Sequence, residues 1–163
     1  MSKIFGELLM LIEADYRDKK ATLAYNGLSF SVPKRLHIIG MMNTADRSLA
    51  MIDYALRRRF SFFDMEPGFD SEGFINYQNS FANETFNTLI ERIKELNKEI
   101  AQDKALGKGF CIGHSYFCNV NDCAEEWMKD VVDFDILPML SEYWFDESSK
   151  LQRWENILHG VFQ

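Results

Sequence analysis

The sequence is poor in cysteine and proline, has no long apolar run, and carries fewer basic than acidic residues. Its three cysteines are an odd number without a recognisable secretion signal, so we expect a reduced, cytoplasmic protein rather than a disulfide framework. No stretch approaches the roughly 20 apolar residues of a membrane helix. The 18 Lys and Arg stand against 25 Asp and Glu, a net charge of −7, which argues against direct tracking of a nucleic-acid backbone.

The amino-terminal part has the texture of an α/β domain. Apolar residues recur at helical spacing over residues 2–16, which predicts a core-facing helix. Residues 21–25 and 28–32 flank Asn26 and Gly27, a pair suited to a two-residue turn, so a β-hairpin is expected there.

A β-α-β unit is predicted to follow. Residues 36–42 are almost continuously apolar, as in a strand covered on both faces, and Phe60, Phe62 and Phe63 indicate a second strand. Ser48 can cap an intervening helix from Leu49 to about Arg58. The polar loop of residues 43–48 would then lie at the carboxyl end of a parallel strand, where such sheets place ligands.

The remainder of the chain is predicted to be helical. One apolar helical stripe is formed by Phe86, Leu89, Ile90, Ile93, Leu96 and Ile100, and further helices are expected over residues 124–143 and 147–158. We place the boundary near Gly68, which divides the chain into residues 1–68 and 69–163.

Two groups of side chains suit phosphate chemistry. Asn43 follows a predicted strand, where an amide can orient an attacking water, and Arg57, Arg58 and Arg59 end a predicted helix, from which they could stabilise a phosphoryl group of a neighbouring subunit. The alternatives are that Asn43 only closes its loop and that the arginines oppose the helix dipole. Asn43 and Asp46 also have the Asn-x-x-Asp spacing of guanine recognition, although the position favours water-orienting and loop-bracing roles.

The run MMNTADRSLA, followed closely by IDYALRRRFSF, resembles the sensor 1 and arginine-finger region of McrB-type AAA+ GTPases. The resemblance extends back through SKIFGELLMLIEAD, similar to the helix after the Walker B strand, and forward through GKGFCIGHSYF into the lid. It implies the following roles: Asn43 as sensor 1, Asp46 and Arg47 as the loop signature, Asp53 on the next helix, and Arg58 and Arg59 as fingers acting in trans.

The resemblance also implies a fold and partners. The expected fold is a partial AAA+ α/β module, with an incomplete parallel sheet, flanking helices and a β-hairpin, followed by an all-helical lid. GTP or ATP with Mg²⁺, a ring of like subunits and a McrC-like nuclease subunit are implied for the intact motor of a methylcytosine-specific restriction system. DNA would be read only by a separate amino-terminal domain.

The sequence departs from the family pattern in what it lacks. It contains no G-x-x-x-x-G-K-[ST] phosphate loop, and no acidic Walker B pair precedes the first helix. We therefore expect no tight nucleotide binding and no hydrolysis by this polypeptide alone. Without the neighbouring strands of a complete module, an apolar face and an open sheet edge would be exposed, so we expect self-association.

Residues 107–123 allow several interpretations. His114 lies where related motors begin the sensor 2 helix and could approach a nucleotide, although a structural histidine among aromatic residues is the alternative. The Cys111, His114, Cys118 and Cys123 side chains could in principle hold zinc, but their spacing matches no common finger. The cysteine cluster leaves a self-contained metal-binding protein as one alternative function. A second alternative is a non-catalytic interaction module of AAA+ ancestry.

Overall fold

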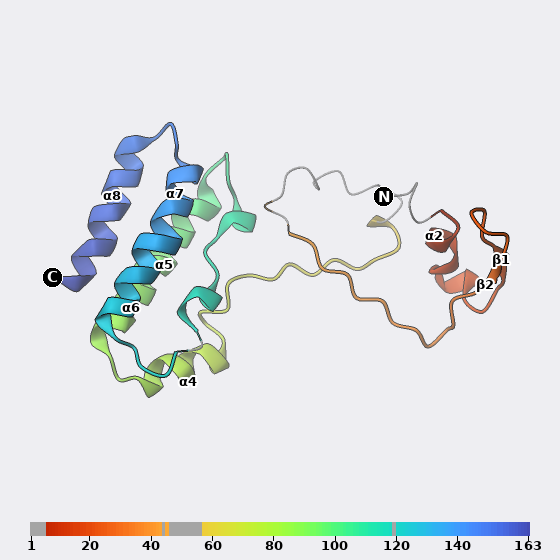
Figure 1. Cartoon of the computed structure of the whole chain (residues 1–163), viewed down its shortest axis with the longest axis horizontal. Coiled ribbons are helices and arrows are strands. Elements are labelled where there is room, and N and C mark those ends of the chain that lie inside the picture. The colour runs from red at the N-terminus through yellow and green to blue at the C-terminus, as the bar shows by residue number, and fades with distance from the viewer. Residues whose placement is uncertain (1–5, 44, 46–56, 119) are drawn as a thin grey trace. The chain divides into compact units, whose positions relative to one another are not determined.

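The computed structural model describes residues 6–43, 45, 57–118 and 120–163. The chain divides into two compact units, Met1–Asp64 and Met65–Gln163. Figure 1 labels the helices and strands of both units.

The first unit has few regular elements among its described residues. They are the short helix α2 (Leu8–Leu11), a 3₁₀ turn (Ala14–Tyr16), and the strands β1 (Ala21–Thr22) and β2 (Ser29–Phe30). The predicted helix over residues 2–16 is therefore shorter and interrupted among the described residues. Residues 1–5 lie outside the described residues.

The predicted β-hairpin is confirmed, but its loop is longer than two residues. β1 and β2 pair antiparallel, with Ala21 opposite Phe30 and Thr22 opposite Ser29. The Leu23 amide donates to the Leu28 carbonyl (2.9 Å), which leaves residues 24–27 as the loop. Gly27 has a φ of 72°, a backbone angle that glycine adopts without a steric cost.

The predicted parallel strands are wrong for this structure. Residues 36–42 and 61–65 are exposed and belong to no strand. Ile39, Met41 and Phe63 are each about nine-tenths exposed, at 91%, 96% and 89%. An extended apolar segment becomes a strand only when hydrogen-bonding neighbours and covering layers are present, and the described residues supply none here. Most of the predicted helix Leu49–Arg58 lies outside the described residues.

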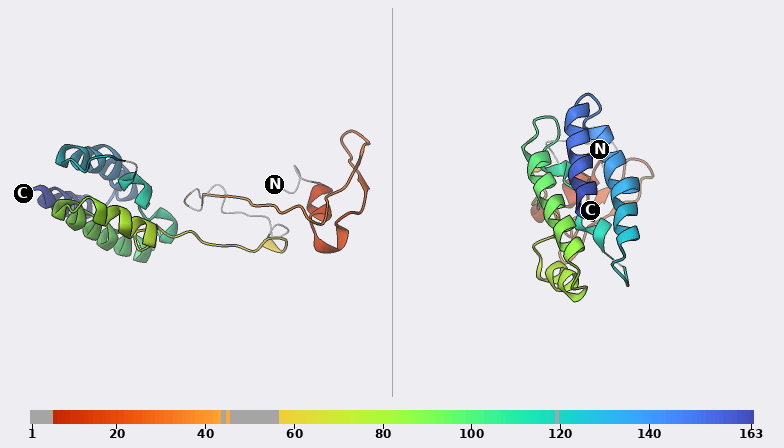
Figure 2. Two further views of the ribbon diagram at one scale, coloured as in Figure 1. Left: turned by 90° about the horizontal axis from the view of Figure 1, so that it is seen from below. Right: turned by 90° about the vertical axis from the view of Figure 1, so that its left-hand side faces the viewer.

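The second unit is helical, as predicted. Its elements in chain order are α4 (Glu72–Ser80), α5 (Glu84–Gln102), 3₁₀ turns at Lys108–Phe110 and His114–Phe117, α6 (Glu125–Asp130), a π-helical turn (Val131–Ile136), α7 (Leu137–Tyr143), α8 (Ser148–His159) and a 3₁₀ turn (Gly160–Phe162). α8 packs against both α5 and α7, and the right-hand view of Figure 2 looks onto this group.

Helix α5 forms the centre of the second unit. Asn83 caps it, because its side-chain oxygen accepts from the Phe86 amide (3.0 Å). The predicted apolar stripe is confirmed, since all six members are at most 1% exposed. The other buried core residues around it are Phe69, Phe74, Ile112, Phe117, Cys123, Met128, Val131, Val132, Ile136, Leu140, Trp144, Trp154 and Leu158.

A polar cluster joins the carboxyl end of α5 to α8. The Asp103 carboxylate accepts from the Lys150 ammonium (2.7 Å) and from the Trp144 indole (3.2 Å). One turn earlier, Glu99 accepts from Arg153 and from the Trp154 indole (3.0 Å). These bonds fix how α8 lies on α5, because the donors Lys150, Arg153 and Trp154 all belong to α8.

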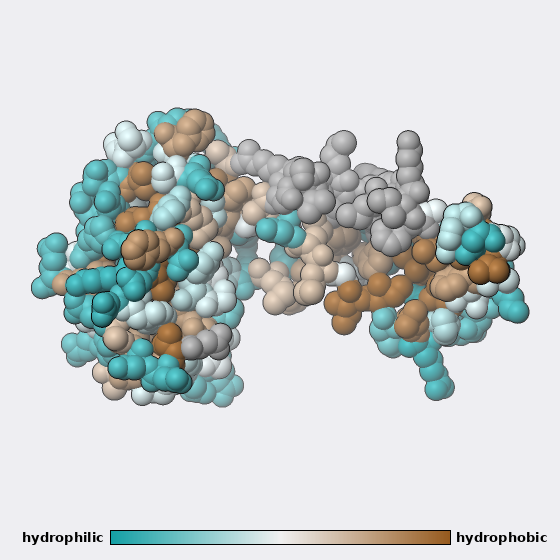
Figure 3. All heavy atoms as spheres, in the orientation of Figure 1, coloured by the Kyte–Doolittle hydropathy of each residue, from teal (hydrophilic) through white to brown (hydrophobic). Residues whose placement is uncertain are grey.

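The two units differ strongly in charge. Residues 1–64 contain 10 basic and 7 acidic residues, whereas residues 65–163 contain 8 basic and 18 acidic residues. The visible face of the second unit is accordingly largely hydrophilic, while apolar atoms are prominent on the first (Figure 3). None of the described helices combines the length and the apolar character needed to cross a membrane.

Candidate functional site

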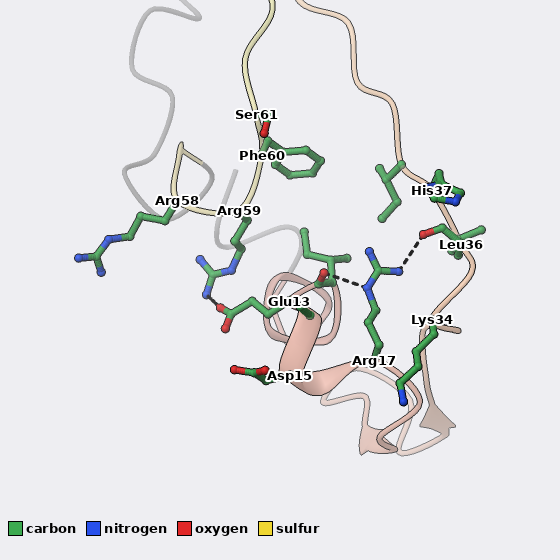
Figure 4. Close-up of a pocket in the computed structure, with 13 residues that line it drawn as sticks. Glu13, Asp15, Arg17, Lys34, Leu36, His37, Arg58, Arg59, Phe60 and Ser61 are labelled. Atoms are coloured by element: carbon green, nitrogen blue, oxygen red, sulfur yellow. Dashed lines mark hydrogen bonds and ion pairs between the residues drawn. The ribbon is translucent and has the colours of Figure 1, made fainter.

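The predicted finger residues line an open hollow in the first unit (Figure 4). Its basic lining residues are Arg17, Lys34, Arg58 and Arg59, and its acidic ones are Glu13 and Asp15. His37, predicted within a strand, lies on its rim. Guanidinium groups in such a place suit phosphate oxygens, which accept two parallel hydrogen bonds from one arginine.

Arg58 and Arg59 differ in their surroundings. Arg59 forms an ion pair with Glu13, and its side chain is only 20% exposed. Arg58 is exposed, and in Figure 4 its side chain points away from Glu13. Arg57 is exposed as well. Arg59 is therefore held by its own unit, whereas Arg58 is presented to solvent.

Arg17 lines this hollow and connects two segments of the first unit. Its guanidinium donates to the carbonyls of Ile12 (2.9 Å), Pro33 (3.2 Å) and Leu36 (3.1 Å). These three bonds tie the segment after the hairpin to the end of α2. Arg17 is thus occupied by backbone acceptors, and no periodicity or motif in the sequence identifies it.

Asn43 braces its own loop. It is exposed, and its side-chain oxygen accepts from the Ala45 amide (3.0 Å), the local bond of an Asx turn. This contact agrees with a loop-bracing role, while a water-orienting role stays a prediction. Asp46, Arg47 and Asp53 lie outside the described residues.

His114 is held in the second unit by backbone and aromatic contacts. Its Nδ1 accepts from the Gly68 amide (3.0 Å), and its ring packs edge-on against Phe69 and Phe74. A Cβ on Gly68 would come within 3.1 Å of the ring, so a larger residue there would require the ring to shift. This arrangement corresponds to the structural alternative for His114. Its approach to a nucleotide stays a prediction.

The three cysteines are engaged separately. The Cys111 and Cys118 thiols donate to the carbonyls of Asn97 (3.5 Å) and His114 (3.3 Å), and Cys123 is buried. Burial raises the pKa of all three thiols, that of Cys123 to about 11. Within the described part of the chain, no three His, Cys, Asp or Glu side chains are grouped to hold a metal ion.

One further polar residue escaped sequence reasoning. Asn97, on the amphipathic helix α5, donates to the Ile112 carbonyl (2.9 Å) and accepts from the Ile112 amide (2.6 Å). This pair of bonds fixes the loop that carries Cys111 and precedes His114. Its signal in the sequence was weak, because a lone asparagine on a helix is usually solvated.

Comparison with known protein families identifies the class of domain to which the helical second unit belongs. Residues 88–152 match the family model of the McrB α-helical lid domain. The chain is also 48% identical to the type IV methyl-directed restriction enzyme EcoKMcrB subunit of Escherichia coli (strain K12). The 172 aligned positions cover 98% of this chain and 38% of that relative. The chain is therefore an McrB-type sequence, and its second unit carries the McrB lid domain.

Proposed function

We propose that this chain contributes half of a nucleotide-hydrolysing site to an AAA+ motor of a methyl-directed restriction system. The observation that carries the proposal is the 48% identity over almost the whole chain to a subunit of such an enzyme. The nucleotide is GTP or ATP with Mg²⁺, bound mainly by a neighbouring subunit. This chain adds the sensor side chain and the arginines.

We assign different roles to Arg58 and Arg59, and their contacts in the first unit support this. Arg58 is the finger that reaches a neighbour's nucleotide, because its guanidinium is exposed and points away from its own unit's acidic residue. Arg59 positions this segment through its ion pair with Glu13. Asn43 braces the adjoining loop and orients the attacking water.

The finger role implies a neighbouring subunit. An arginine that acts in trans reaches a nucleotide held by another McrB-type subunit, which supplies the phosphate cradle and the magnesium ligands of that site. A McrC-like nuclease subunit joins the assembled ring. DNA is bound by another domain, and the acidic charge of the second unit supports this because acidic residues repel phosphate backbones.

Phosphate release from GTP and ATP tests this function. The assay uses a ring-forming McrB-type subunit whose own fingers are replaced by alanine, with and without this chain. The chain should restore hydrolysis, and a chain carrying both Arg58→Ala and Arg59→Ala should bind the ring without restoring it.

The controls separate catalysis from docking. Reactions without nucleotide and with the chain alone set the background, and co-sedimentation measures binding to the ring. Binding of the unaltered chain without any recovery of hydrolysis would instead support a non-catalytic docking module.

A further inference from the structure

The segment immediately before α4, residues 66–71, contacts the rest of the second unit at four of its six positions. We call it the leading segment. Its contacts are Glu66 with Lys108 (2.6 Å), the Gly68 amide with His114 Nδ1 (3.0 Å), Phe69 buried in the core, and Asp70 with Lys94 (2.8 Å). Only six residues separate this segment from Arg59 in the sequence. Its position therefore fixes the point from which the finger-bearing chain leaves the second unit.

The bond from Gly68 requires an unprotonated Nδ1 on His114. In the neutral ring the proton then lies on Nε2, because one nitrogen accepts while the other carries hydrogen. A protonated imidazole has hydrogen on both nitrogens and cannot accept from an amide. Protonation would therefore place two N–H groups against each other at a contact of 3.0 Å.

The titratable groups that contact the leading segment and His114 are Glu66 with Lys108, Asp70 with Lys94, and Cys118. The ring itself faces the uncharged rings of Phe69 and Phe74. The Lys108 hydrogen bond lowers the pKa of Glu66, and the Asp70 hydrogen bond raises the pKa of Lys94. These two bonds favour the charged forms of Glu66 and Lys94. The Cys118 thiol, which donates to the His114 carbonyl, stays protonated because burial raises its pKa.

We propose that His114 is the positioning residue for the leading segment, and that its protonation releases Gly68. The contact itself does not depend on the proposed function, although its consequence for the arginine finger does. Nothing in the contact requires a bound nucleotide.

Amide hydrogen exchange at Gly68 tests this directly on the whole 163-residue chain. Protection is measured by NMR at pH 8 and pH 5.5 and corrected for the intrinsic exchange rate at each pH. We expect protection at Gly68 to fall about 5- to 10-fold at the lower pH, the effect of losing one hydrogen bond. The amide of Ile93, in the centre of α5, should stay protected at both values.

Three variants separate positioning from general stability. His114→Asn places an oxygen acceptor where Nδ1 lies but does not titrate, so Gly68 should be protected at both pH values. His114→Leu keeps bulk without an acceptor and should lose protection at both. His159→Gln removes the histidine that contacts Asp133 and should leave the Gly68 profile unchanged.

The result for Gly68 alone decides the proposal. Protection that is independent of pH in the unaltered chain, or a His114→Asn variant that keeps the full pH dependence, would overturn it. Because no nucleotide is present, failure here leaves the finger proposal standing. Failure of the hydrolysis assay, equally, leaves this contact standing.

Discussion

Replacing Asp103 by asparagine tests how much the polar cluster between α5 and α8 stabilises the second unit. Hydrogen bonds from Lys150 and then from the Ala105 amide lower the pKa of Asp103 from 3.8 to about 2. The Asp103 side chain is only 10% exposed and the Lys150 side chain 18%, so solvent screens the pair weakly. A lowering of this size corresponds to about 2 kcal/mol of folding free energy at neutral pH.

The pH dependence has a definite sign. Because the folded-state pKa is the lower one, the stabilisation is complete well above pH 3.8 and is lost as the pH falls toward about 2. The Asp103→Asn variant should therefore be less stable by about 2 kcal/mol at pH 7 and by only about 1 kcal/mol at pH 3.

Urea unfolding followed by far-ultraviolet circular dichroism measures both differences. Circular dichroism is preferable to tryptophan fluorescence here. The Trp144 indole donates to Asp103, so the substitution itself could change the tryptophan emission. The matched control is Glu91→Gln, which removes an exposed carboxylate paired with Lys94 at 3.4 Å and should cost less than about 0.5 kcal/mol. Equal stability of the unaltered chain and the Asp103→Asn variant at pH 7, or a difference that does not shrink at pH 3, would refute the reasoning.

Three other changes have expected results. Gly68→Ala should lower the free energy of unfolding by about 1–2 kcal/mol, since the new Cβ meets a His114 ring wedged against two phenylalanines; an unchanged urea midpoint would contradict this. Asn83→Ala removes the cap of α5 and a bond to the Cys123 carbonyl, so thermal unfolding should show a loss of about 1 kcal/mol, whereas Asn83→Asp should retain the cap. At pH 8, Cys123 should react with a thiol-specific disulfide reagent at least about 100-fold more slowly than free cysteine, because burial raises its pKa to about 11; equally fast reaction would contradict its burial.

The helical unit was predictable because its signal is local. The apolar stripe of α5 repeats with the helical period, and its members are buried as the pattern requires. The hairpin was also local, although the exact loop length depends on the backbone bond between Leu23 and Leu28.

Contacts between distant residues were not predictable in the same way. Gly68 and His114 lie 46 positions apart, and neither belongs to a periodic pattern that would pair them. The same holds for Arg59 and Glu13. Residues 36–42 carry the apolar composition of a buried strand, but composition cannot supply the neighbours that a strand requires.

Arg58 and Arg59 tested singly give the most direct measure of the central claim, that this chain supplies an arginine to a neighbour's nucleotide. Phosphate release by a finger-deficient McrB-type ring would be compared with the unaltered chain, Arg58→Ala, Arg58→Lys and Arg59→Ala added in turn at saturating concentration. We predict that Arg58→Ala lowers the restored rate of hydrolysis by about 10³-fold or more and that Arg58→Lys restores little of this rate. Arg59→Ala should lower the rate less than Arg58→Ala does. Full restoration by a ring-bound Arg58→Ala chain would contradict the claim.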